Sequence, residues 1–253
     1  RDRRSEGGGR GEAGGALRPL GGADGHLKTG SFRRLIVGEP IGIFYGYKFD
    51  GIFQSEEEVQ KLTTQPSPLG VGYRRYKDLD GDGAVDSSND RMILGDSNPD
   101  FFGGLTNNFS YKGLELNIFF QYSYGNEIFN YNAIELETPT GGQNAYRELL
   151  DRWTPTNPSQ IYPKATTNRA ALVSDRWVED GSYLKLKTVS LSYSFPKLKS
   201  NFFRSMRLHI TAQNLKTWTN YRGYDPEVSF RGASTLQGGE DFGGYPQART
   251  FMM

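Results

Sequence analysis

Residues 101–124 read FFGGLTNNFSYKGLELNIFFQYSY, and this stretch decides the fold. Apolar and polar side chains alternate on either side of Lys112-Gly113, a two-residue turn with glycine in its second position. After the turn, Leu114, Leu116 and Ile118 share one face of an extended chain, while the residues between them are mostly polar. The stretch therefore predicts an antiparallel hairpin with one apolar face and one largely polar face.

Other segments show the same alternation, bounded by turn residues. The further strands predicted in this way are Ile41–Phe53, Tyr183–Phe195, Met206–Gln213 and Ala248–Met253. The alternation slips by one residue near Lys187-Thr188, which predicts a β-bulge there, and the last strand is expected to be cut short after it starts. A single short helix is predicted over Asn144–Trp153, ended by Thr154-Pro155.

The lengths of the connections separate a soluble β-sandwich from a barrel. Gly125–Arg176 and Thr217–Gln247 are much longer than loops of compact domains, which rarely exceed about 15 residues. Lys112-Gly113 and Pro196–Ser205 are shorter. Membrane barrels combine short turns at one rim with long loops at the other. We therefore predict an all-β fold made of strands of an antiparallel transmembrane β-barrel.

Composition excludes several classes of protein. The 253 residues carry 30 Lys and Arg against 29 Asp and Glu, a formal net charge of +1, so no nucleic-acid-binding face is expected. The absence of cysteine rules out disulfides, thiolate metal sites and a cysteine nucleophile. Residues 1–30 are rich in Gly and Arg, with few large apolar side chains, and are expected to be disordered or foreign to the fold. Residues 31–253 are treated as one unit.

A run of acidic residues follows the spacing of a calcium-binding loop, with acids at positions 1, 3, 5 and 9 and glycine at position 6. The candidate ligands are Asp78, Asp80, Asp82, Ala84 through its carbonyl, Asp86 and Asp90. The usual closing Glu is absent; Asn89 stands at position 12 and Asp90 at position 13, so affinity should be weaker than in a sensor loop. Structural Ca²⁺ is the candidate cofactor. The alternative is an Asp/Gly turn with solvated carboxylates and no metal.

Signals of catalysis are weak, and no organic cofactor is indicated. A Ser/His/Asp triad would have to use His209, and the sequence has no G-x-S-x-G elbow around a serine. A carboxylate pair for glycoside hydrolysis stays open because the loops hold acids. These loop acids are Glu135, Glu137, Asp175, Glu179 and Asp180. We expect the protein not to be an enzyme.

A series of short motifs resembles the C-terminal region of SusC/RagA-type TonB-linked outer-membrane proteins. The motifs, in order, are Val37–Gly42, Tyr45–Tyr47 with Asp50–Phe53, Asp90–Gly95, Asn98–Gly104, Arg152–Pro158, Glu179–Lys187, Tyr193–Pro196, Gln213–Leu215 and Tyr221–Glu227. Each motif is weak alone, but their common order is specific, and the resemblance covers about residues 36–253.

This resemblance implies part of a plugged barrel of about 22 strands in the Gram-negative outer membrane. It implies import of oligosaccharides or peptides, energy from the TonB complex, and a surface substrate-binding lipoprotein as partner. The polar strand faces, with residues such as Glu115 and His209, would line the lumen, and the other faces would meet outer-membrane lipid. Plug, TonB-contacting segment and signal peptide are not in this sequence, so the isolated chain is expected to need detergent or to aggregate.

The rival hypothesis is a secreted, calcium-stabilised β-domain that binds glycans through its loops. The two hypotheses differ in the apolar strand face. A barrel turns it to lipid, whereas a sandwich buries it against a second sheet.

Overall fold

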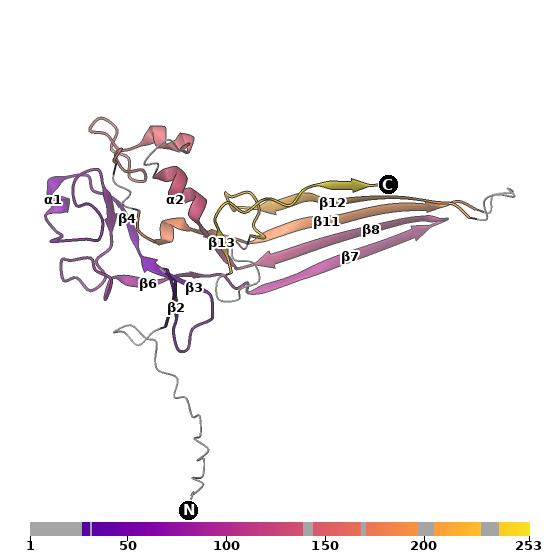
Figure 1. Cartoon of the computed structure of the whole chain (residues 1–253), viewed down its shortest axis with the longest axis horizontal. Helices are drawn as coiled ribbons and strands as arrows, with labels where there is room; N and C mark the ends of the chain where they lie inside the picture. The colour runs from indigo at the N-terminus through magenta and orange to yellow at the C-terminus, as the bar shows by residue number, and fades with distance from the viewer. Residues whose placement is uncertain (1–26, 31, 139–143, 168–170, 197–204, 229–237) are drawn as a thin grey trace, which may run out of the picture.

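A computed structural model describes residues 27–30, 32–138, 144–167, 171–196, 205–228 and 238–253. The chain forms a long sheet with a lobe of shorter elements at one end (Figure 1). The long sheet has five strands in the order β14-β12-β11-β8-β7. Their bounds are β7 Phe101–Tyr111, β8 Leu114–Tyr124, β11 Tyr183–Ser194, β12 Arg207–Thr219 and β14 Thr250–Met252.

The hairpin read from residues 101–124 is confirmed. Strands β7 and β8 pair antiparallel in unbroken register from Phe101 opposite Tyr124 to Tyr111 opposite Leu114. The two turn residues have positive φ, 46° at Lys112 and 85° at Gly113, as a type I′ turn requires. This turn lies at the end of the sheet farthest from the lobe (Figure 1).

The predicted bulge in β11 is also confirmed. The register of β11 against β8 and against β12 shifts between Leu186 and Thr188. On the β12 side, Asn214 takes up the irregularity with a φ of 54°. The extra residue, Lys187, lies between two residues that keep their pairing, so the strand changes phase without leaving the sheet.

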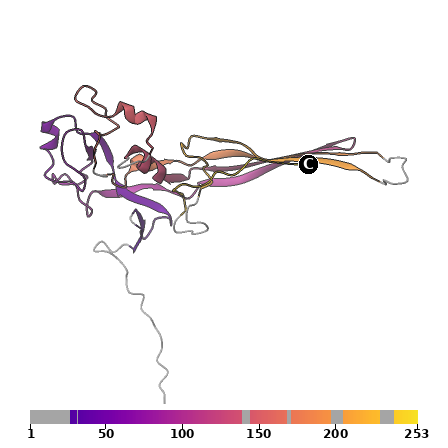
Figure 2. The ribbon, with the colours of Figure 1, turned by 45° about the horizontal axis from the view of Figure 1, so that its top comes forward.

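The long sheet has two chemically different faces. Phe109 and Leu105 on β7, Leu208 on β12 and Phe251 on β14 belong to the apolar face, and they stay exposed, at 59%, 58%, 47% and 70%. On the opposite face, polar side chains of neighbouring strands hydrogen-bond to one another. These hydrogen bonds run from Asn117 to Asn108, between Ser190 and Thr211, and from Arg207 to Glu115. Figure 2 shows the strands as a single twisted layer, and no second sheet covers the apolar face within the described residues.

The lobe contains three small sheets. One has the order β1-β2-β3-β6, the second β10-β9-β13, and the third pairs β4 with β5. The strands are β1 Leu27–Gly30, β2 Arg33–Leu35, β3 Ile43–Tyr47, β4 Phe49–Ile52, β5 Arg74–Tyr76, β6 Arg91–Asp96, β9 Glu127–Asn130, β10 Val178–Asp180 and β13 Glu240–Asp241. The helices are α1 Glu56–Val59 and α2 Tyr131–Glu137, with 3₁₀ turns η1 Arg147–Asp151 and η2 Asp175–Trp177.

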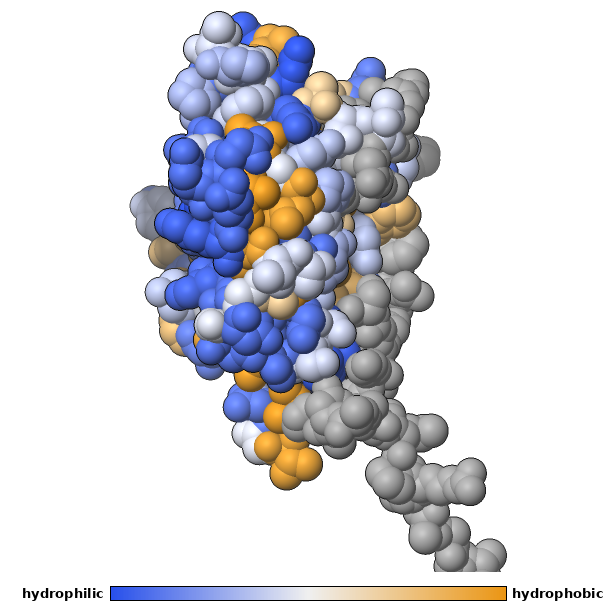
Figure 3. Space-filling model, turned by 90° about the vertical axis from the view of Figure 1, so that its left-hand side faces the viewer, coloured by the Kyte–Doolittle hydropathy of each residue, from blue (hydrophilic) through white to orange (hydrophobic). Residues whose placement is uncertain are grey.

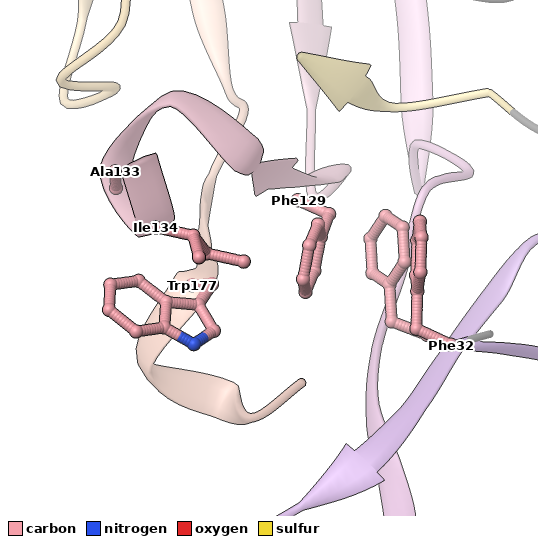
Figure 4. Close-up of a cluster of buried hydrophobic side chains, with 6 residues drawn as sticks. Phe32, Phe129, Ala133, Ile134 and Trp177 are labelled. Atoms are coloured by element: carbon pink, nitrogen blue, oxygen red, sulfur yellow. The ribbon is translucent and has the colours of Figure 1, made fainter. Parts of the chain in front are cut away.

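An aromatic core holds the lobe together. Phe32 stacks on Phe129 with ring centroids 4.4 Å apart, and Ile134 of α2 and Trp177 of η2 extend the cluster (Figure 4). Trp177 is fully buried and donates from Nε1 to the carbonyl of Leu172 at 2.9 Å. Seen from the α1 end, the lobe is largely hydrophilic, with hydrophobic residues gathered across its middle (Figure 3).

Several predicted boundaries were wrong. Ile41–Phe53 is two strands in different sheets, because the chain leaves β3 at Lys48, whose carbonyl accepts from the amide of Lys77 at 2.9 Å. The helix predicted over Asn144–Trp153 is only the 3₁₀ turn η1, and the long connection after β8 also holds β9 and α2. In the segment expected to be disordered, Leu27–Gly30 pairs with β2, while residues 1–26 lie outside the described part. No helix among the described residues is long and apolar enough to span a membrane.

Candidate functional site

A cluster of opposite charges fixes the segment after β12 to the polar face of the sheet. We call residues 221–227 the latch segment. Lys185 of β11 contacts Asp225 at 3.1 Å and also pairs with Glu227, which accepts from Lys187 at 3.0 Å. Gln121 of β8 adds a bond to Glu227 at 2.7 Å. Two lysines and two carboxylates therefore neutralise each other where the sheet meets the lobe.

Strand geometry explains why both lysines reach the same carboxylate. Lys185 lies on the polar face, and side chains two residues apart in a strand point to the same face. The register shift leaves Lys187 itself unpaired, and it still contacts Glu227 at 3.0 Å. Burial disfavours ionisation of Glu227, but the hydrogen bonds from the two lysines outweigh it, so the pKa of this carboxyl lies below its usual value.

The other end of the latch segment is attached to the lobe. The hydroxyl of Tyr221 donates to Asp241 of β13 at 2.6 Å, and Arg222 binds Glu179 of β10 at 2.7 Å. Burial and the acceptor Asp241 raise the pKa of Tyr221. The segment thus connects the long sheet with two strands of the lobe.

Most of the loop acids that left a hydrolase open form ion pairs. Glu137, fully buried at the end of α2, accepts from Arg176 at 3.0 Å and 2.5 Å. Glu179 pairs with Arg222, and Asp175 pairs with Lys48 at 2.5 Å. Carboxylates paired in this way have a structural role in the charge balance of the lobe.

The acidic loop follows β5, and its own carboxylates accept hydrogen bonds from its backbone amides. Carboxylate oxygens of Asp78, Asp80 and Asp82 lie within 4.8 Å of one another, as a cation would require. The two oxygens of Asp78 accept from the amides of Gly81 at 2.7 Å and Gly83 at 2.8 Å, and these bonds lower the pKa of this carboxyl, the one from Gly83 most.

The remaining predicted ligands serve the loop differently. Asp90 is buried and accepts from the amides of Leu79 at 2.6 Å and Asp86 at 2.7 Å, so it joins the two ends of the loop. Asp86 accepts from Ser88 and Asn89. Ala84 is hydrogen-bonded to Asp82 through its amide at 2.8 Å. The structure therefore brings three of the six candidates together in one cluster.

Sequence reasoning missed the ionic cluster of the latch segment. Lys185, Lys187, Asp225 and Glu227 were visible only as parts of short motifs. A signal that could have found the lysines is their two-residue spacing, which places both cations on the polar face of the strand.

A single-layer antiparallel sheet with an exposed apolar face, a polar face and a lobe of long loops at one end is the architecture of antiparallel β-barrel wall. The comparisons with known proteins agree. TonB-dependent receptor P3 of Formosa agariphila is 37% identical over 237 residues, which cover 91% of this chain and 23% of the relative. TonB-dependent receptor SusC of Bacteroides thetaiotaomicron is 25% identical over 185 residues, covering 70% of this chain and 17% of the relative.

Solved structures show the same fold. The RagAB peptide importer in its open-open state matches with a TM-score of 0.66 and 24% identity, over 89% of this chain and 23% of that chain. The closed-closed state gives a TM-score of 0.67 and 24% identity over 89% of this chain and 24% of that chain. No protein-family model matches the chain.

The chain is homologous to TonB-dependent receptors, as the motif resemblance indicated. It spans 23% of the length of TonB-dependent receptor P3 and 23% of the matched chain of the RagAB importer in its open-open state. These relatives are named receptors and a peptide importer, not enzymes, which supports the expectation that the protein is not an enzyme.

Proposed function

We propose that this chain forms part of the wall and the outer loops of an outer-membrane importer of nutrients. The observation that carries this proposal is the apolar face of the long sheet, which is exposed along β7, β11 and β12 while the opposite face is polar. Burying such a face in lipid is favourable, at about 25 cal/mol per Å² of apolar area. The homology to TonB-dependent receptors supports the same role.

The partners follow from the same proposal. Energy would come from the TonB complex through parts of the receptor outside this chain, and a surface lipoprotein would deliver substrate to the lobe. The substrates would be oligosaccharides or peptides. The neighbouring structures are of a peptide importer, which favours peptides, whereas the relatives named TonB-dependent receptor leave the substrate open.

Uptake by cells tests the function. Cells that carry the complete receptor are compared with cells lacking its gene and with cells in which the TonB complex is inactivated. Fluorescent peptide and oligosaccharide mixtures of about ten units serve as probes. We expect one mixture to accumulate only in the first strain. Equal accumulation of both mixtures in all three strains would refute an energised import role.

We further propose that the acidic loop holds a structural Ca²⁺, with Asp78, Asp80, Asp82 and Asp86 and the carbonyl of Ala84 as ligands, and with Asp90 closing the loop. The convergence of three carboxylates supports this, since a divalent cation relieves their mutual repulsion. Calorimetric titration of the whole protein in detergent should show Ca²⁺ binding that D80N removes. D151N, a matched change at an exposed acid of η1, should leave the binding unchanged. If the D80N variant still bound Ca²⁺ with the same heat, the acidic loop would not be the binding site.

A further inference from the structure

A pocket of about 460 Å³ lies in the lobe, away from the acidic loop. The end of α2, the turn η1, residues 163–166 and Arg74 of β5 form its walls. This volume is in the range of small-molecule sites, which start at about 300 Å³. Its apolar lining residues include Leu149, Leu150 and Pro163.

The described lining carries an excess of positive charge. Arg74, Arg147, Arg152 and Lys164 face a single carboxylate, that of Glu137. Glu137 is already engaged by Arg176, which binds it through two nitrogens, and Arg222 lies 3.5 Å from its other oxygen. Within the described part of the chain, no ion pair engages Arg147 or Arg152. The one carboxylate of the lining is therefore already paired, and the four cations outnumber it.

Arg74 is the unusual member of this group. It is 5% exposed, and neither Nε nor Nη2 of its guanidinium has a hydrogen-bond partner among the described residues. Its guanidinium carbon lies 5.5 Å from the centre of the Trp177 ring, so an aromatic face supports it on one side (Figure 4 shows this indole beside Ile134). Burial lowers the pKa of Arg74. Leaving buried donors unpaired is costly, so a partner beyond the described protein atoms, a ligand or an ordered water, is expected here.

We infer that this pocket binds the carboxylate of a nutrient chain, with Arg74 and the surrounding cations holding the anion and Leu149 and Leu150 contacting the uncharged remainder. The Nε and Nη2 nitrogens of a guanidinium form the edge that pairs with two oxygens of a carboxylate. Arg147, Arg152 and Lys164 attract the same charge from the rim. The carboxylate could end a peptide or belong to an acidic oligosaccharide.

This inference names a ligand class for the proposed importer, but its test measures binding and not uptake, so the two can fail separately. Binding to the whole protein in detergent is measured by calorimetry with two pairs of probes. One pair is tetraalanine with a free or an amidated C-terminus. The other is trigalacturonate or its methyl ester. In at least one pair the charged member should bind about tenfold or more tightly than the neutral one.

Variants assign that preference to the pocket. R74M should abolish the difference between charged and neutral probes. R75M is the matched control, because Arg75 is the next residue of β5 and pairs instead with Asp50 at 2.9 Å and Glu58 at 3.0 Å. It should keep the difference. R74K keeps the charge but loses the planar guanidinium, so its preference for the charged probe should lie between those of the native protein and R74M.

The outcomes separate clearly. A charged probe preferred by the native protein and by R75M, but not by R74M, supports the site, and the responding pair identifies peptide or sugar. Equal binding of charged and neutral probes, no binding in either pair, or a preference that survives R74M would overturn it. If R74M does not fold, the native comparison and R74K decide in the same way.

Discussion

Replacing Lys185 should detach the latch segment from the long sheet. The Lys185 side chain is 2% exposed and pairs with both Asp225 and Glu227. Replacing it by Met in K185M removes the charge and keeps most of the volume. Asp225 is then left buried without an ion partner in the described residues, while Glu227 keeps Lys187.

The free-energy cost of K185M follows from the burial of the ion pair. Removing one member of a buried ion pair costs about 3–5 kcal/mol, because the remaining charge is left without compensation in a region of low dielectric. Since Lys187 still balances one of the two carboxylates, we expect the lower end, about 3 kcal/mol. That corresponds to roughly a hundredfold increase in the population of the opened segment.

Amide hydrogen exchange of residues 221–228 in the whole protein measures this opening. K185M should speed exchange there by about a hundredfold, while β7 and β8 keep their protection. K48M provides the matched control, because Lys48 pairs with Asp175 in an exposed position, 47% and 26% accessible, where such pairs contribute about 1 kcal/mol or less. Equal effects of K185M and K48M on residues 221–228 would refute the argument.

Three further predictions concern the sheet, the latch segment and the lobe. L105R places a charge at mid-strand on the apolar face and should cost about 2–4 kcal/mol of folding free energy in detergent, whereas N108R on the polar face should be tolerated; similar losses for both would contradict the assignment of faces. Glu227 has a lowered pKa when folded, so its contribution is present above its unfolded pKa, about 4.3, and is lost as pH falls through the folded value. The Tm difference between native protein and E227Q should therefore shrink between pH 7 and pH 3.5, and a constant difference would exclude this linkage. G46A should destabilise the lobe by about 1–3 kcal/mol and so lower the Tm, because a Cβ at Gly46 would lie 2.5 Å from the carbonyl oxygen of Val173. G238A should leave the Tm unchanged, because the nearest atom to its Cβ lies at 3.8 Å.

The long strands could be predicted because their information is local. The alternation on β7 and β8, the turn at Lys112-Gly113 and the slip at Lys187-Thr188 each depend on neighbours in sequence, and all three are found in the structure. Alternation alone left open whether the apolar face meets lipid or a second sheet, and the similarity in fold to the RagAB importer favours barrel wall.

The lobe was harder to predict because its elements depend on distant partners. Strand β9 has four residues and pairs with β10 and β13, which lie far along the chain. The helix α2 begins directly after β9, with the Asn130 side chain accepting from the amide of Ala133. No pattern in the sequence singled out Arg74. Among the described residues it has no acidic partner, because the nearby carboxylate of Glu137 pairs with Arg176, a contact between residues far apart in sequence.

The orientation of the sheet in a membrane tests the central claim most directly. These 253 residues have no cysteine. In the whole protein, with any cysteine elsewhere replaced by serine, single cysteines are introduced at Ser88, in the acidic loop of the lobe, and at Lys112, in the turn at the opposite end of the sheet. Intact cells carrying the whole protein are treated with a membrane-impermeant maleimide. S88C should be labelled from outside and K112C only after the outer membrane is permeabilised. Labelling of both positions from the same side, or recovery of the labelled protein outside the membrane fraction, would contradict a sheet that forms barrel wall.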